Sequence, residues 1–153
     1  MPNLEYFTPV DADLQTIWSV LLDRIENPAR YMAGVESCRF IENEPDYTVR
    51  EVTVQGTPLI ERISIDERQG EVIYQLVNHP LFSGRVVHAL IPPASDDLKA
   101  KPVVRFRMEW EPLNEEAQAI ERESHTALEE GLKQGVHYVR DLAEHMEKTP
   151  KEA

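Results

Sequence analysis

The stretch NEEAQAIERESHTALEEGLKQGVHYVRDLAEHMEK, Asn114–Lys148, decides the fold. Its apolar and small side chains recur three and four residues apart, as on one face of an α-helix, and no proline interrupts them. Asn114 can cap the helix, and Glu115 and Glu116 suit the positive end of its dipole. The pattern therefore predicts one helix, about 52 Å long. Thr149 and Pro150 end it, and we expect residues 149–153 to fray.

The predicted inward face of this helix contains two glycines four residues apart. Each costs about 1 kcal/mol relative to alanine in a helix, so both need a reason. They either leave room for a ligand or let the helix pack closely on its partner or bend, and the sequence leaves both explanations open. The full inward stripe reads Ala117, Ile120, Ser124, Ala127, Leu128, Gly131, Leu132, Gly135, Val136, Val139, Leu142, Ala143 and Met146.

The middle of the chain reads as strands rich in valine, isoleucine, phenylalanine and tyrosine, separated by turn signals. Several connections are short, which indicates antiparallel pairing. With a first strand at Leu4–Thr8, seven strands are predicted. The other six are Val35–Glu42, Tyr47–Gln55, Leu59–Asp66, Val72–Val77, Val86–Ile91 and Val103–Trp110.

Two helices are predicted between the first and second strands. Apolar residues at helical spacing indicate an amphipathic helix over residues 12–26, with Asp11 as its cap and Asp13 in its first turn. Asn27 and Pro28 start a second, short helix that Gly34 ends. The chain is thus an α+β domain, in which a curved antiparallel sheet of seven strands wraps around the C-terminal helix.

Length and charge exclude several classes of protein. The 153 residues suit one domain, 1–153. A net charge of −12 disfavours a nucleic-acid partner. Cys38 has no second cysteine to pair with, and neither a signal peptide nor an apolar run of membrane-spanning length is seen. We therefore expect a cytoplasmic protein.

Three polar residues share a strand face with apolar neighbours and are candidate catalytic groups: Glu61, Tyr74 and His88. A half-buried carboxylate with a raised pKa suits acid–base chemistry, and a phenol beside an imidazole can orient a carbonyl or hydroxyl group. A strand-end glutamate near water and a structural histidine are the plainer alternatives. The opposite faces of strands 72–77 and 86–91 are equally apolar, so the sequence does not decide which face points inward.

Alternation in the last predicted strand turns Val104, Phe106, Met108 and Trp110 inward, and Arg105, Arg107 and Glu109 toward solvent. Leu81 and Phe82 are expected on a loop, where they gate a pocket, contact a partner or plug one end of the core. The predicted ligand-binding residues are Tyr74, His88, Phe106, Met108, Ser124, Ala127, Leu128, Gly131 and Gly135.

No sequence motif indicates a metal or a cofactor. The five histidines are scattered, and HExxH, CxxC, phosphate-binding glycine loops and the GxSxG elbow are absent from the sequence. We expect neither a metal nor a cofactor. Cys38 has no evident catalytic partner and suits a small apolar role.

The order of strand, two helices, six strands and the unbroken helix Asn114–Lys148 resembles the START-like, or helix-grip, superfamily. Gly70-Glu71-Val72, Asn78-His79-Pro80, and Gly84 before Arg85-Val86-Val87 make the chain similar to a small subfamily named after an acetylaranotin-biosynthesis protein (AtaL-like). The superfamily contains lipid-transfer domains, plant allergen-type proteins, polyketide aromatase/cyclases and chaperone activators. One departure is the loop Glu42–Asp46, which lacks the glycines of the plant members, so no phosphate-like contact is carried over.

Three functions remain open. The resemblance and the small-residue stripe favour a carrier of a small hydrophobic molecule, such as a lipid, polyketide or aromatic metabolite. The same cavity with Glu61, Tyr74 and His88 would instead serve a cyclase, aromatase or dehydratase. A module that binds another protein predicts a filled core and an apolar surface patch.

Overall fold

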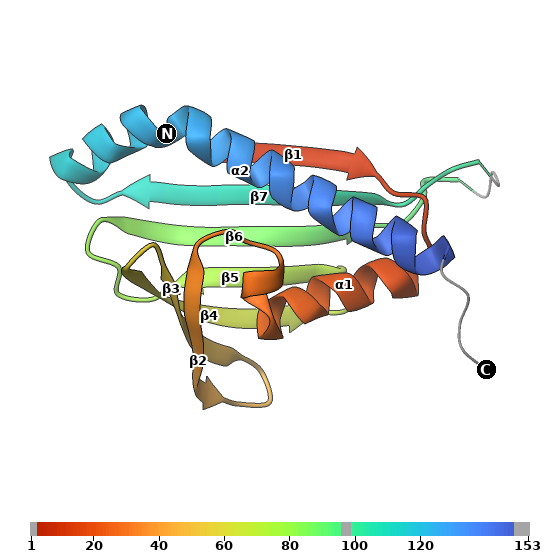
Figure 1. Ribbon diagram of the computed structural model, residues 1–153, viewed down its shortest axis with the longest axis horizontal. Coiled ribbons are helices and arrows are strands. Elements are labelled where there is room, and N and C mark those ends of the chain that lie inside the picture. The colour runs from red at the N-terminus through yellow and green to blue at the C-terminus, as the bar shows by residue number, and fades with distance from the viewer. Residues whose placement is uncertain (1–2, 96–98, 149–153) are drawn as a thin grey trace.

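The computed structural model describes residues 3–95 and 99–148 (Figure 1). The tail predicted to fray, 149–153, lies outside the described residues. The elements follow one another as β1 Asn3–Pro9, α1 Leu14–Glu26, the 3₁₀ helix η1 Pro28–Arg30, β2 Val35–Asn43, β3 Thr48–Val54, β4 Thr57–Asp66, β5 Glu71–Leu76, β6 Phe82–Ile91, β7 Val103–Pro112 and α2 Glu115–Lys148.

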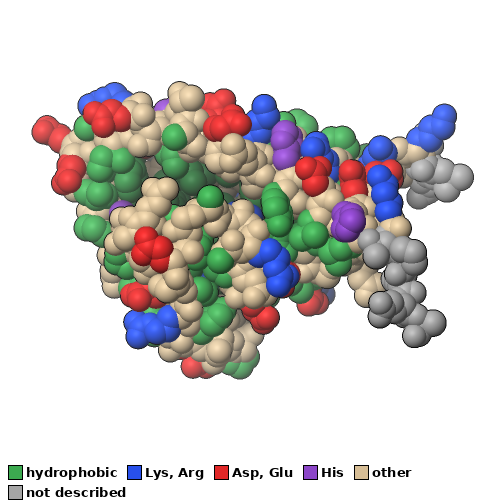
Figure 2. Space-filling model, in the orientation of Figure 1, with side chains coloured by type: hydrophobic (Ala, Val, Ile, Leu, Met, Phe, Trp, Pro, Cys, Tyr) green, Lys and Arg blue, Asp and Glu red, His purple; other side chains and the backbone are tan. Residues whose placement is uncertain are grey.

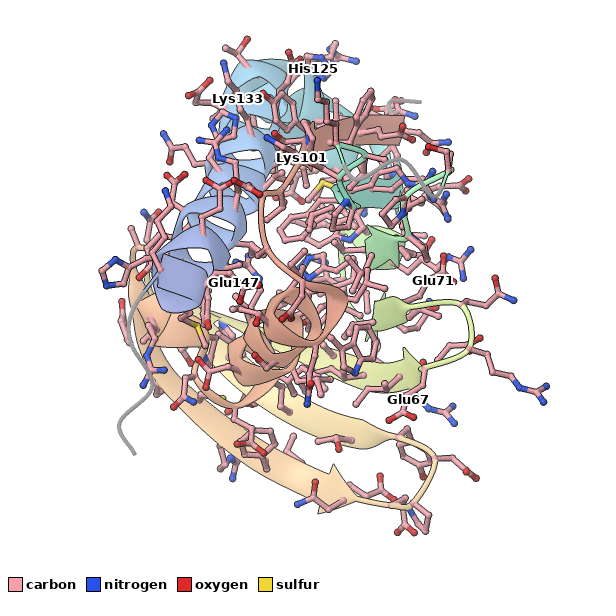
Figure 3. All side chains as sticks on the ribbon, turned by 90° about the vertical axis from the view of Figure 1, so that its right-hand side faces the viewer. Glu67, Glu71, Lys101, His125, Lys133 and Glu147 are labelled. Carbon is pink, nitrogen blue, oxygen red and sulfur yellow. The ribbon has the colours of Figure 1, made fainter. Side chains whose placement is uncertain are left out.

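The predicted α+β helix-grip architecture is confirmed. Seven strands form one antiparallel sheet in the order β1-β7-β6-β5-β4-β3-β2. Strands β2 to β7 form a meander, and β1 closes the far edge against β7. The sheet curves around α1 and α2, which lie on its concave side (Figures 1 and 3). Two register shifts in β2, which interrupt the ladder, add twist at this edge.

Three local predictions need correction. The cap of α1 is Asp13, not Asp11, because the Asp13 carboxylate accepts a 2.8 Å hydrogen bond from the Thr16 amide. The second helix is a single 3₁₀ turn, since only Pro28–Arg30 have that geometry. Phe82 belongs to β6 rather than to a loop, and it is buried. With Ala117 and Leu76 it plugs one end of the core, as one of the alternatives expected.

Gly84 is required by a close approach between β6 and β7. It pairs with Trp110 and has φ +121°, and a Cβ at this position would lie 1.9 Å from the Glu109 carbonyl oxygen. Any side chain here would separate the two strands. The glycine that precedes Arg85 in the sequence is therefore required for the close pairing of β6 with β7.

The strand phase that the sequence left open is settled by burial. Tyr74 and His88 are each 3% exposed and face the concave side, where they belong to or contact the main core. Phe106 and Val104 point the same way, as predicted. The opposite, convex face carries the ion pairs of Glu109 with Arg85 and Arg107, so the prediction that this charge cluster faces outward is confirmed.

Candidate functional site

The C-terminal half of α2 packs solidly on the sheet and α1. Val136, Val139 and Ala143 have no exposed surface. A Cβ added to Gly135 would lie 3.2 Å from Phe106 Cε2 and 3.6 Å from Arg24 Nη2. At Gly135, therefore, the close-packing explanation applies, and the helix contacts its neighbours there without an intervening cavity.

The N-terminal half of α2 is packed less tightly. Ile120, Ser124 and Leu128 stay partly exposed although they lie on the inner side of the helix, and Met108 and Trp110 of β7 are partly exposed as well. The buried residues form two separate clusters, with Leu128 and Met108 beside one, and Ile120 and Trp110 beside the other. Figure 2 shows a hollow lined by hydrophobic side chains beneath this half of α2. We call this space, bounded by these five residues, the hollow.

Three residues of the predicted inward stripe do not lie on the buried face. Ala127, Gly131 and Met146 are exposed, and a Cβ added to Gly131 would meet no atom within 4 Å. Their assignment to the packed face of the helix is wrong. Gly131 nevertheless borders open space, in contrast to Gly135.

Five polar side chains converge beside the hollow, and we call them the polar cluster: Arg24, Arg50, Glu61, Tyr74 and His88. Each is at most 9% exposed. They come from α1 and from the four consecutive strands β3, β4, β5 and β6. The antiparallel register explains the convergence, because Arg50 lies directly opposite Glu61, and Tyr74 lies opposite Ile63 on the same face as Glu61.

Arg50 and Glu61 form a buried ion pair, with 3.2 Å between Arg50 Nη2 and Glu61 Oε1. Arg50 also donates hydrogen bonds to the backbone carbonyls of Arg24 and Ile25, at the C-terminal end of α1. A cation at that end complements the helix dipole. The charge of Arg50 is therefore met by a carboxylate and a helix terminus.

Aromatic rings connect the remaining members of the cluster. The Arg24 guanidinium lies 5.3 Å from the centre of the Phe106 ring and 5.6 Å from that of Tyr31. His88 stacks on the same Phe106 ring, with 3.6 Å between the two ring centres. Tyr74 lies 4.8 Å from His88, and Arg50 lies 5.3 Å from Tyr74. The five polar groups thus form one electrostatically coupled unit.

Burial shifts the pKa values of Arg24, Glu61, Tyr74 and His88. It lowers the pKa of His88 well below 6.5, and the cations Arg24 and Arg50 lower it further. It raises the pKa of Glu61, against the opposing effect of Arg50, and raises that of Tyr74 to about 12. It lowers the pKa of Arg24 from its usual 12.5. At neutral pH the site holds a neutral imidazole and a neutral phenol.

Several buried polar atoms of the site have no hydrogen-bond partner among the described residues. They are Arg24 Nη1, Arg50 Nε, the Tyr74 hydroxyl, His88 Nδ1 and, in the hollow, Trp110 Nε1. Buried polar atoms in native proteins are normally hydrogen-bonded. The hydrogen-bonding capacity of these atoms is not used by any described residue of the chain.

The structure brings together all three candidate catalytic residues, Glu61, Tyr74 and His88, and adds two arginines that the sequence analysis missed. A signal for Arg24 was present, because it follows Ile17 and Leu21 at the spacing of one apolar helix face. Arg50 shares a strand face with the buried Val52. Each arginine is thus a charged residue within an otherwise apolar pattern, which is the signal that indicates a buried charge.

Other parts of the described chain offer less defined sites. One shallow surface pocket, of about 310 Å³, lies between η1 and β2. A second, of about 300 Å³, lies where Val10–Ala12 meet Lys99–Pro102 and Glu147. Neither lies between α2 and the sheet. Within residues 3–95 and 99–148, no three His, Cys, Asp or Glu side chains gather as a metal site would need. None of the described helices has the length and apolar character of a membrane span.

A family described as acetylaranotin biosynthesis cluster protein L (AtaL) matches residues 12–146. No curated protein matches the chain. Among solved structures, the Zhui aromatase/cyclase from a Streptomyces species superposes with a TM-score of 0.71 at 18% identity, and the match covers 94% of each chain. A di-domain aromatase/cyclase of steffimycin biosynthesis, StfQ, gives 0.73 at 12% identity over 94% of this chain and 51% of that one. A Thermus thermophilus protein gives 0.72 at 12% identity over 95% and 99%. At these identities the likeness establishes the fold.

Proposed function

The chain belongs to the AtaL family, and we propose that it binds a small, mainly apolar molecule in the hollow between α2 and the sheet. A lipid, a polyketide or an aromatic metabolite fits this description. The observation that carries the proposal is the partial exposure of Ile120, Ser124 and Leu128 on the inner side of α2, facing Met108 and Trp110. Apolar surface left uncovered inside a fold is a common feature of ligand sites.

The fold supports the same proposal. Two of the similar structures are aromatase/cyclases, one of them from steffimycin biosynthesis, and this chain shares their fold. In this chain, Trp110 Nε1, the Tyr74 hydroxyl and His88 Nδ1 are unpaired donors or acceptors beside apolar walls. A few polar groups in an apolar site fix the orientation of a ligand.

Filling the hollow tests the proposal. Ser124→Phe places a ring on the inner, partly exposed side of α2. We expect it to weaken binding of the neutral dye Nile red by about tenfold or more, measured by fluorescence titration. Thr126→Phe is the matched control, since Thr126 is exposed and two residues further along, on the opposite side of the helix. Equal dye affinity in wild type and both variants would remove the hollow as the binding site.

A second candidate function, cyclisation with loss of water, is favoured by the convergence of Glu61, Tyr74 and His88. In such a reaction a base removes a proton from the carbon between two carbonyl groups. The resulting carbanion attacks the carbon of a further carbonyl group, whose oxygen takes up a proton and becomes a hydroxyl group. Water is lost in a later step, in which the hydroxyl group takes up another proton and the neighbouring carbon gives one up. Neutral His88 would accept the proton, and the Tyr74 hydroxyl would donate one to the developing alkoxide. If a poly-β-ketone is turned over equally fast by the wild type and by the Glu61→Gln, Tyr74→Phe, His88→Phe triple variant, this assignment is wrong.

A further inference from the structure

The charges of the polar cluster do not balance. It holds two guanidinium groups, Arg24 and Arg50, and one carboxylate, Glu61. Glu61 and the carbonyls at the end of α1 are all bonded to Arg50. One buried positive charge therefore remains, on Arg24.

Arg24 has no carboxylate within ion-pair distance in the described part of the chain, and the attraction of Glu61, which is bonded to Arg50, reaches it only at longer range. Arg24 is 9% exposed, forms no ion pair there, and its Nη1 atom has no hydrogen-bond partner. The rings of Tyr31 and Phe106 lie over its guanidinium within 5.6 Å and 5.3 Å of their centres. Ring contacts of this kind offset part of the cost of burying a cation, but they do not use its N–H groups.

Arg24 lies at the boundary between the packed half of α2 and the hollow. Its Nη2 atom lies 3.6 Å from the position that a Gly135 Cβ would occupy, on the packed half of α2. Phe106, under the guanidinium, is two residues from Met108 on the same face of β7. The unpaired atoms of Tyr74 and His88 lie on this side of the sheet as well.

We propose that the ligand is a monoanion with an apolar body, and that Arg24 is the counter-ion for its carboxylate or enolate group. This inference rests on the proposed function, since it names the chemical class of the molecule in the hollow. A guanidinium donates two parallel hydrogen bonds to a carboxylate, which a neutral ligand cannot match. The net charge of −12 gives no general attraction for anions, so the preference must come from the site itself.

Matched acids and alcohols test the inference in the wild-type chain. Decanoate is compared with decan-1-ol, and 1-naphthoate with 1-naphthylmethanol, by calorimetric titration at neutral pH. We expect each acid to bind about tenfold or more tightly than its alcohol, because a hydrogen bond to a charged group contributes that much. Equal affinities within both pairs would overturn the inference.

Three variants assign the preference to Arg24. Arg24→Met should lower the affinity of each acid to about that of its alcohol, whereas Arg24→Lys should retain part of the acid's advantage. Arg39→Met removes a charge from an exposed arginine whose side chain is 70% accessible, and it should preserve the full preference. An acid preference that survives in Arg24→Met would also overturn the inference.

Thermal unfolding without ligand separates a ligand-binding role from a structural one. Since Arg24→Met removes an unpaired buried charge, we expect its Tm to equal or exceed that of the wild type. A large fall in Tm would show that Arg24 serves the fold instead, and the acid–alcohol comparison in the wild type still decides the ligand class. Binding of Nile red that depends on Ser124, without any preference for acids, would leave the proposed function standing and remove only the counter-ion. If neither Nile red nor any of the four probes binds, both claims are overturned: the hollow as a ligand site and Arg24 as the counter-ion.

Discussion

At the scale of single residues, the site is dominated by charges that the fold has buried. Arg50 and Glu61 are 4% and 8% exposed, and each is the other's partner. Burying two ions costs desolvation energy that their attraction only partly returns, so the pair is not expected to be a net source of stability. Removing one partner is nevertheless costly, because the other is left uncompensated.

We therefore expect Arg50→Met to lower the free energy of unfolding by about 3–5 kcal/mol, measured by urea denaturation. The double variant Arg50→Met, Glu61→Leu should recover most of this loss, since both charges are then gone. If the double variant were as unstable as Arg50→Met alone, the loss would not arise from an unpaired Glu61 carboxylate.

A second residue-scale prediction concerns pH. The folded chain holds His88 neutral, because its pKa lies well below 6.5, whereas the unfolded chain binds a proton at about that pH. His88 therefore contributes stability that is present above pH 6.5 and is lost as the pH falls, by up to about 1.4 kcal/mol per pH unit. His88→Phe should flatten the profile of unfolding free energy between pH 6.5 and 5. His125→Gln, at a histidine whose side chain is 45% exposed, is the control and should keep the slope. A slope unchanged in His88→Phe would contradict the assignment.

At the scale of elements, periodicity predicted α2 to within one residue, and Asn114 caps it as expected by accepting a 2.9 Å hydrogen bond from the Ala117 amide. The same periodicity misplaced Ala127 and Gly131. Residues four apart in an α-helix are about 40° past a full turn, so two such steps turn Ala127 about 80° away from Gly135. The spacing of apolar residues identifies a helix well. Over the 34 residues of α2, however, it does not show which of the two glycines packs against the sheet.

The two helix glycines should respond differently to alanine. Gly131→Ala should raise the free energy of unfolding by about 0.5–1 kcal/mol, because the new methyl group meets no atom and the helix gains propensity. Gly135→Ala gains the same propensity but forces Phe106 to move from 3.2 Å, so we expect no net gain or a loss. Chemical denaturation of both variants decides this, and equal stabilisation would contradict the packing described for the C-terminal half of α2.

At the scale of the whole molecule, the sequence sufficed for the antiparallel meander and for naming Glu61, Tyr74 and His88 as candidates. The inward orientation of Tyr74 and His88 came only from their burial in the structure. The sequence did not reveal the pairing of Arg50 with Glu61 or the approach of Arg24, because both depend on how α1 docks into the concave sheet. It also did not reveal that the space under α2 is uneven. The final helix is packed over its second half and open over its first, which supports a ligand site more than the completely filled core expected of a protein-interaction module.

The most direct measurement is a crystal structure of the chain soaked with 1-naphthoate, beside one of the ligand-free chain. We expect the naphthalene rings between Leu128, Met108 and Trp110, with the carboxylate on the Arg24 guanidinium. A hollow closed by its own side chains in the ligand-free crystal, or naphthoate bound only elsewhere, would contradict the claim that α2 leaves room for a guest.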